Sequence, residues 1–205
     1  MIATKKFVLS FFSHTFKDIS DVPWYYSLFY TIVDSKYGVS KRLDTTLSEQ
    51  LVSPHPELVA VAKQLRRESS GRDDLIIRIL KYVKDRIVYT SDQDNFGMVE
   101  KWSDAYTTWK LKKDDCDGMN ALIYILGRLA GMSQFSLWSS IGSVDGGGHY
   151  WLLYFSSETD KWYSIDSTYY YDPTPICDRI PFEFSEDKYV GSWCVFNENF
   201  MLRQG

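Results

Sequence analysis

Three side chains that could together perform nucleophilic chemistry occur in the order Cys116, His149 and Asp166. A thiol nucleophile needs an adjacent base and a third group that orients the base. Cys116 stands at the start of an apolar helical pattern, where the unpaired backbone N–H groups and the helix dipole favour a thiolate. Asp115 and Asp117 oppose ionisation of the thiol by like-charge repulsion, so a cationic histidine is needed nearby. His149 is the candidate for that role.

The pairing of His149 with Asp166 follows from an expected hairpin. Residues 157–159 are typical of a turn between two strands, Tyr150–Phe155 and Lys161–Ile165. Counting outward from this turn places His149 opposite Asp166. Directly opposed residues on antiparallel strands project from the same face, with Cβ atoms roughly 4.5–5.5 Å apart. We therefore expect the carboxylate to hold the ring nitrogen remote from sulfur and to stabilise the imidazolium.

Apolar residues at helical spacing predict three helices before this hairpin. The first begins at Pro56 and is broken at residues 69–71, the second begins near Asp73 or Asp74, and the third begins near Asp114 or Asp115 and ends near Gly131. Residues 92–115 are expected to form a long connection that contains Trp102 and Trp109. The third helix thus carries Cys116 in its first turn.

After the third helix the pattern changes to that of strands, rich in β-branched and aromatic residues. Helices followed by an antiparallel sheet are typical of the α+β class. We expect residues 57–205 to form a catalytic core with a C-terminal tail, and residues 1–56 to form an aromatic-rich N-terminal extension. The expected strands are Phe135–Ile141, Tyr150–Phe155, Lys161–Ile165 and Ser192–Phe196.

Composition argues against several classes of partner. The formal charge is −4 and the sequence has no Lys/Arg-rich stripe; the nearest feature is a short basic run at residues 110–113, so nucleic acid is not expected as the main partner. The apolar stretch at residues 7–12 is too short for a membrane span, and no cleavage site follows it. Three cysteines without C-x-x-C spacing indicate neither zinc nor a disulfide scaffold. We therefore expect a cytoplasmic or otherwise intracellular protein that needs no cofactor.

Asp92, Asp94 and Asn95 partly match a calcium-binding loop. The rest of that pattern is missing, so a solvated loop is preferred and no metal is expected.

The three blocks around the nucleophile, base and carboxylate resemble those of the transglutaminase-like superfamily, which includes bacterial transglutaminase-like cysteine peptidases. The blocks are residues 115–118 (DCDG), 148–151 (GHYW) and 162–168 (WYSIDST). The resemblance spans roughly residues 56–168 and implies a papain-like fold. It also implies that Cys116 attacks an amide carbonyl, His149 shuttles the proton and Asp166 orients His149.

The resemblance further implies an oxyanion site made by the Cys116 backbone N–H and one more donor. Trp102, through its indole N–H, is the candidate, with Trp109 as the fallback. In one departure from the family, Asp114 stands where many relatives carry Gly, which adds negative charge beside the nucleophile.

The leading functional hypothesis is a thiol hydrolase, a cysteine peptidase or amidase, that acts on a protein or peptide substrate. A transglutaminase-type acyl transferase is an alternative, because both activities pass through the same thioester and differ in whether water or an amine resolves it. A second alternative is a non-enzymatic component of a large particle that contacts neighbouring subunits. Aromatic residues such as Trp24, Tyr25 and Tyr26 would then touch another chain.

Overall fold

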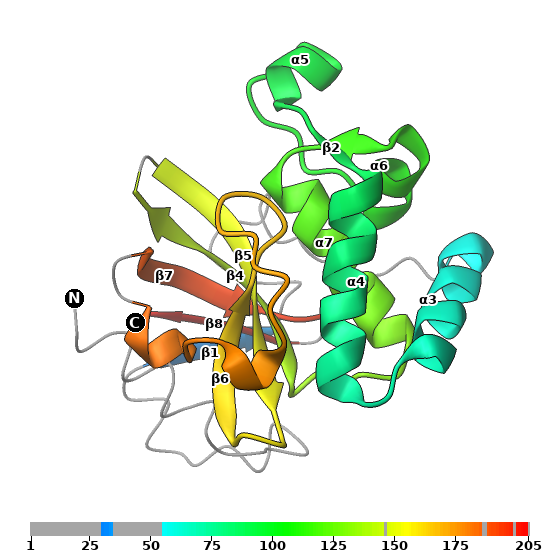
Figure 1. Cartoon of the computed structure of the whole chain (residues 1–205). Helices are drawn as coiled ribbons and strands as arrows, with labels where there is room; N and C mark the ends of the chain where they lie inside the picture. Colours follow the sequence, from blue (N-terminus) through cyan, green and yellow to red (C-terminus); the bar gives the residue numbers. More distant parts are fainter. Residues whose placement is uncertain (1–29, 35–54, 146, 186–187, 199, 205) are drawn as a thin grey trace.

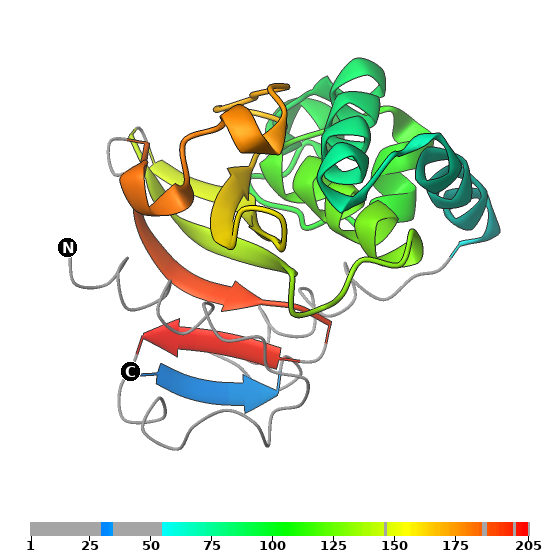
Figure 2. The same cartoon turned by 60° about the horizontal axis from the view of Figure 1, so that its bottom comes forward.

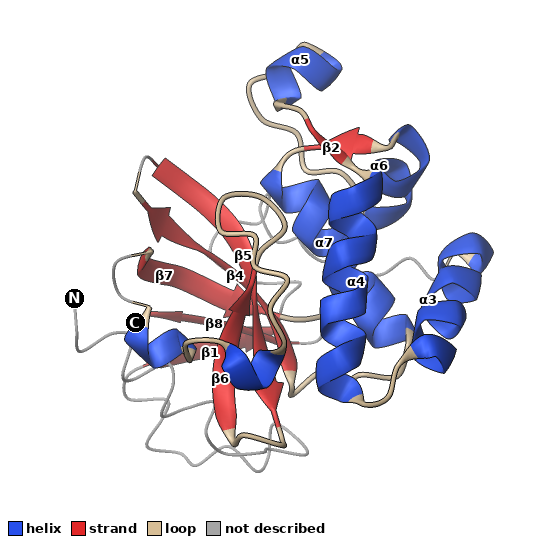
Figure 3. Cartoon of the chain, in the orientation of Figure 1, coloured by secondary structure: helices blue, strands red, loops and turns tan. Residues whose placement is uncertain are grey.

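A computed structural model describes residues 30–34, 55–145, 147–185, 188–198 and 200–204. A group of helices lies beside one antiparallel sheet (Figures 1 and 3). This arrangement confirms the α+β class expected from the sequence. The described helices include none with both the length and the apolar character that a membrane span requires.

The three long helices agree closely with the sequence pattern. Asp115 caps α7, and its side chain accepts a hydrogen bond from the backbone N–H of Asp117, as expected for an acidic N-cap. Gly131 follows α7 with a φ of 91°, a conformation that glycine adopts easily after a helix. The helices are α3 (Pro56–Glu68), α4 (Arg72–Arg86), α5 (Asp92–Phe96), α6 (Ala105–Leu111) and α7 (Cys116–Leu129).

The expected long connection at residues 92–115 was wrong, because it contains α5, α6 and the short strand β3 (Lys113–Asp114). Ser91 caps α5 and Asp104 caps α6 through side-chain hydrogen bonds to the first-turn N–H groups. β3 pairs in parallel with β2 (Val88–Tyr89), which brings the chain after α4 beside the start of α7.

The six-stranded sheet has the order β1-β8-β7-β4-β5-β6, and every neighbouring pair is antiparallel. Strands β1 and β8 lie at the edge of the sheet that is farthest from the helices (Figure 2). Two 3₁₀ turns, η3 (Ile176–Asp178) and η4 (Phe182–Phe184), follow β6. The strands are β1 (Tyr30–Asp34), β4 (Leu137–Val144), β5 (Gly147–Ser156), β6 (Lys161–Ile165), β7 (Tyr189–Phe196) and β8 (Phe200–Gln204).

Helix α7 runs through the centre of the core. Every residue from Asp117 to Gly127 is buried, because α7 packs against α3, α4 and α6 and also against strands β4 and β5. A helix that is covered on all sides cannot shift without disturbing the whole core. The first turn of α7, which carries Cys116, is therefore held firmly.

The N-terminal segment joins the same sheet, because β1 pairs with β8 along its whole length. The rest of the expected extension, residues 1–29 and 35–54, lies outside the described residues, and so do Trp24, Tyr25 and Tyr26.

Candidate functional site

Cys116 and His149 line one cavity of about 350 Å³, between the N-terminus of α7 and strand β5. A hollow of this size is typical of small-ligand or side-chain binding sites. The wall combines aromatic rings with carboxylates, and none of the described residues that form it is a lysine or an arginine. Its residues are Tyr89, Glu100, Trp102, Asp115, Cys116, Asp117, Ile141, Gly148, His149, Tyr150 and Tyr169.

His149 and Asp166 form a buried pair. Nε2 of His149 lies 2.7 Å from Oδ2 of Asp166, and neither side chain is exposed to solvent. The other oxygen of Asp166 accepts hydrogen bonds from the backbone N–H and the hydroxyl of Thr168, at 2.8 and 2.9 Å. Burial alone would raise the pKa of Asp166, but these bonds and the bond to His149 lower it below its ordinary value. An ionised Asp166 only accepts hydrogen bonds, so Nε2 carries the proton.

The hairpin register that predicted this pair was wrong by two residues. Ser156 pairs with Lys161 and Leu152 with Ile165, so the ladder ends at Ile165, one residue before Asp166. The turn is shifted because residues 157–160 form the loop, in which Asp160 adopts a φ of 56°. A shift of two residues keeps every side chain on its original face, so Asp166 still reaches His149.

Cys116 is half-buried at the start of α7. Burial raises the pKa of this thiol, and the charges of Asp115 and Asp117 raise it further. The backbone N–H of Tyr150 donates a hydrogen bond to the sulfur and opposes this effect only in part. The like-charge repulsion expected from the sequence is therefore present.

Nδ1 of His149 is the ring nitrogen left for the nucleophile. It is buried and makes no hydrogen bond to any described residue, so it does not bond to the sulfur of Cys116 in this resting arrangement. In the neutral imidazole with its proton on Nε2, Nδ1 carries the free lone pair and can accept a proton. The structure thus brings all three predicted residues together, with the acceptor nitrogen unused.

The two tryptophans considered as oxyanion donors differ in position. Trp102 lines the cavity, but its side chain hydrogen-bonds to the carboxylate of Glu100. Trp109 lies in α6, and its indole N–H donates to the hydroxyl of Tyr82 at 3.2 Å, outside the cavity. Of these two tryptophans, only Trp102 therefore lines the cavity.

Asp114 is turned away from the cavity. Its side chain is fully buried between α6 and α7, where Oδ2 lies 2.6 Å from the hydroxyl of Thr108 and Oδ1 accepts from the N–H of Asp115. Burial raises the pKa of Asp114 to about 6. The extra charge expected beside the nucleophile is thus directed into a helix contact.

Asp92, Asp115 and Asp117 form a carboxylate cluster that the sequence reasoning missed. One oxygen from each lies within 4.8 Å of the others. Asp92 is 3% exposed; one of its oxygens accepts from the N–H of Lys101, and Oδ1 has no partner among the described residues. Buried carboxylates at this spacing can hold a cation with a preference for oxygen ligands. The parallel pairing of β2 with β3 brings Asp92 here. The solvated loop expected from the sequence at Asp92, Asp94 and Asn95 was wrong, because these residues form α5.

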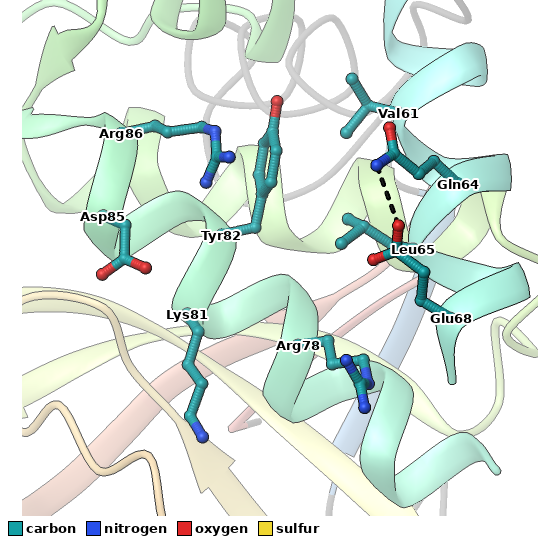
Figure 4. A pocket seen from close by; sticks show the side chains of 9 residues that line it. All are labelled: Val61, Gln64, Leu65, Glu68, Arg78, Lys81, Tyr82, Asp85 and Arg86. Atoms are coloured by element: carbon teal, nitrogen blue, oxygen red, sulfur yellow. Dashed lines mark hydrogen bonds between the residues drawn. The ribbon is translucent and has the colours of Figure 1, made fainter. Parts of the chain in front are cut away.

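A second cavity, of about 400 Å³, lies between α3 and α4 (Figure 4). Its wall mixes both signs of charge, and Gln64 donates to Glu68 within it at 2.9 Å. None of the described residues in its wall is a cysteine or a histidine. The remaining cysteines line neither cavity: Cys177 is exposed and Cys194 is buried. Among the described cysteines, only Cys116 therefore lines a cavity that also contains an imidazole.

Comparison with known proteins gives distant structural similarities only. No family model matches the chain, and no curated protein matches it significantly. LapG of Legionella pneumophila is similar at 14% identity, covering 75% of this chain and 89% of that chain, with a TM-score of 0.48. Its calcium-bound form is similar at 15% identity, over 72% of this chain and 90% of that chain, with a TM-score of 0.47. A protein described as a TGase is similar at 16% identity, over 73% of this chain but 38% of that chain, with a TM-score of 0.42. We draw no functional conclusion from similarities at this level.

Proposed function

We propose that the protein is a thiol hydrolase that cleaves amide bonds in a protein or peptide substrate, with Cys116 as nucleophile. The observation that carries this proposal is the state of His149. Nε2 of His149 is hydrogen-bonded to Asp166, and Nδ1 has no partner among the described residues. His149 lines the same cavity as Cys116. A base oriented in this way beside a thiol is the arrangement that activates a nucleophile.

In the proposed reaction the sulfur of Cys116 attacks the amide carbonyl carbon, and the thiol proton passes to Nδ1 of His149. Asp166 stabilises the imidazolium that forms. The tetrahedral intermediate then collapses, the C–N bond breaks, and the leaving amine takes the proton from His149. Water, deprotonated by His149, then attacks the thioester carbon. The C–S bond breaks, the carboxylic acid leaves, and the sulfur takes the proton back from His149, which restores the thiol.

The negative oxygen of the intermediate needs hydrogen-bond donors that are already in place. The backbone N–H of Cys116, at the start of α7, is one donor. The indole N–H of Trp102 is the second, provided that substrate displaces Glu100 from it. Removing one such donor typically lowers kcat by about 100- to 1000-fold.

The test is turnover of generic peptide amides by the wild type and by three single cysteine variants. Cys116→Ala should abolish turnover, whereas Cys177→Ala and Cys194→Ala should retain it. Intact-mass measurement after treatment with a peptide aldehyde or chloromethyl ketone should show one adduct, located on Cys116. Turnover that survives in Cys116→Ala would place the chemistry elsewhere.

Acyl transfer to an amine is the second candidate, and the charge of the cavity favours it. Glu100, Asp115 and Asp117 line the cavity, and no lysine or arginine does so within the described part of the chain. A cationic primary amine would therefore be attracted to it. A fluorescent primary amine supplied with a glutamine peptide would be incorporated by a transferase. Release of ammonia without incorporation would indicate hydrolysis.

We also propose that the carboxylate cluster of Asp92, Asp115 and Asp117 binds a divalent cation, with Ca²⁺ as the best fit to an all-oxygen donor set. A bound cation would neutralise repulsion among these carboxylates and tie the loop that carries Asp92 to the start of α7. It would not itself take part in the steps above.

A further inference from the structure

Asn120 occupies an unusual position one turn after Cys116 on helix α7. Residues four apart lie on the same face of a helix, so Asn120 follows Cys116 along the face that meets strand β5. Its side chain is completely buried. A buried amide is retained at low cost only when its donors and acceptor are bonded.

The amide of Asn120 links two segments of chain. Nδ2 donates to the carbonyl of Tyr150 at 2.7 Å, and Oδ1 accepts from the backbone N–H and the hydroxyl of Ser167, both at 3.1 Å. The carbonyl can only accept and the N–H can only donate, so these partners fix which end of the amide points where. Tyr150 directly follows His149, and Ser167 directly follows Asp166.

Strand pairing does not hold these two segments together. The β5–β6 ladder stops at Leu152 and Ile165, and the same register continued by two residues would pair Tyr150 with Ser167. At that place the Asn120 amide stands between the two backbones. The N–H of Tyr150 is likewise taken by the sulfur of Cys116. Helix α7 thus replaces β6 as the partner of β5 beside the site.

We propose that Asn120 is a positioning residue that sets the separation between the backbones carrying His149 and Asp166, and so aligns both with Cys116. The catalytic part of this inference rests on the proposed thiol chemistry; the alignment of the histidine–aspartate pair does not. Asn is suited to this place because one planar group offers both a donor and an acceptor. Alanine offers neither and would leave the carbonyl of Tyr150 and the N–H of Ser167 to find other partners.

The experiment compares Asn120→Ala and Ser167→Ala with a matched control, Asn197→Ala. Asn197 is also fully buried and donates to a carbonyl, that of Gln134 at 3.2 Å, but it does not line the cavity. The first readout is the low-field proton resonance of Nε2–H of His149, which reports the bond to Asp166 and needs no activity. The second is kcat and KM on a peptide amide.

We expect Asn120→Ala to shift or broaden the His149 resonance and to lower kcat by about 10- to 100-fold, with KM changed less than about twofold. Ser167→Ala removes one of the two bonds from Ser167, so it should shift the resonance in the same direction by less. Asn197→Ala should leave resonance and kinetics as in the wild type, whatever its loss of thermal stability.

An unshifted His149 resonance in folded Asn120→Ala overturns the proposal, and so does an equal shift in Asn197→Ala. If Asn120→Ala does not fold, Ser167→Ala decides: a shifted resonance supports the proposal and an unshifted one overturns it. A wild type without turnover whose resonance responds to Asn120→Ala would refute the proposed function and leave the positioning role standing. Turnover by the wild type, together with a His149 resonance that does not respond to Asn120→Ala, would refute the positioning role and leave the proposed function standing.

Discussion

Gly118, two residues after Cys116, is the place where the smallest side-chain addition should have a large effect. A Cβ added there would lie 2.3 Å from Oδ2 of Asp114 and 2.7 Å from the hydroxyl of Thr108. Real Cβ atoms do not approach other atoms so closely, so Gly118→Ala must displace the carboxylate. Asp114 is fully buried and hydrogen-bonded through both oxygens, so it has no free direction in which to move.

The cost follows from three contributions. Crowding a packed core costs about 1–3 kcal/mol. Moving Asp114 leaves the Thr108 hydroxyl or the Asp115 N–H without its partner, which costs about 1–3 kcal/mol more. Alanine regains about 1 kcal/mol over glycine in a helix interior. The balance is a loss of about 3 kcal/mol in the free energy of unfolding, or a fall in Tm of about 6–12 °C for a chain of this size.

The control is Gly127→Ala in the same helix. Its Cβ would meet Cδ2 of Leu137 at 2.8 Å and the sulfur of Met132 at 3.1 Å. The first atom is a terminal methyl group and the second lies near the end of an unbranched, flexible side chain, so we expect a loss of at most about 1 kcal/mol. Urea unfolding measures both variants. Equal stability of Gly118→Ala and Gly127→Ala would refute the reasoning. It would also be refuted if Gly118→Ala lowered the free energy of unfolding by the same amount in the Asp114→Ala variant as in the wild type.

Asp166→Asn should lower the free energy of unfolding most at neutral pH. The folded-state pKa of Asp166 is lowered, so the stabilisation that Asp166 gives is present above the unfolded carboxyl pKa of about 3.9 and is lost as pH falls through the folded value. Urea unfolding curves of the wild type and Asp166→Asn that stay equally far apart from pH 7 to pH 3 would contradict this. Millimolar CaCl₂ should raise the Tm of the wild type, and EGTA should reverse the rise. Asp92→Asn should abolish the response, and an equal response in that variant would place the cation elsewhere. Arg128→Ala should lower the free energy of unfolding by about 1–3 kcal/mol, because it removes the guanidinium whose Nη2 lies 2.5 Å from Oε1 of the half-buried Glu198. A loss below about 0.5 kcal/mol in thermal unfolding would show that this ion pair contributes little.

The helices and the class of fold were predictable because their signals are local. Apolar spacing and caps define α3, α4 and α7 to within a residue or two. The short helices α5 and α6 were missed, although Ser91 and Asp104 are ordinary caps, because neither helix is long enough to show a period.

The three candidate residues that the sequence singled out lie together in the structure, but their contacts were not predictable. His149 meets Asp166 even though the predicted register was wrong, because an even shift preserves the face of a strand. The bond from Trp102 to Glu100 depends on how distant segments pack. No spacing in the sequence could have revealed this contact, or the hydrogen bonds of the Asn120 amide to Tyr150 and Ser167.

The hydrogen bond from the Tyr150 amide to the sulfur of Cys116 gives the protein an internal reporter. An amide proton that is bonded to sulfur changes its chemical shift and its rate of exchange with solvent when the sulfur acquires an acyl or alkyl group. Isotopic labelling of tyrosine alone would therefore make the occupancy of the thiol visible at one backbone position. The chemistry could then be followed without a chromogenic substrate, and before any natural substrate is identified.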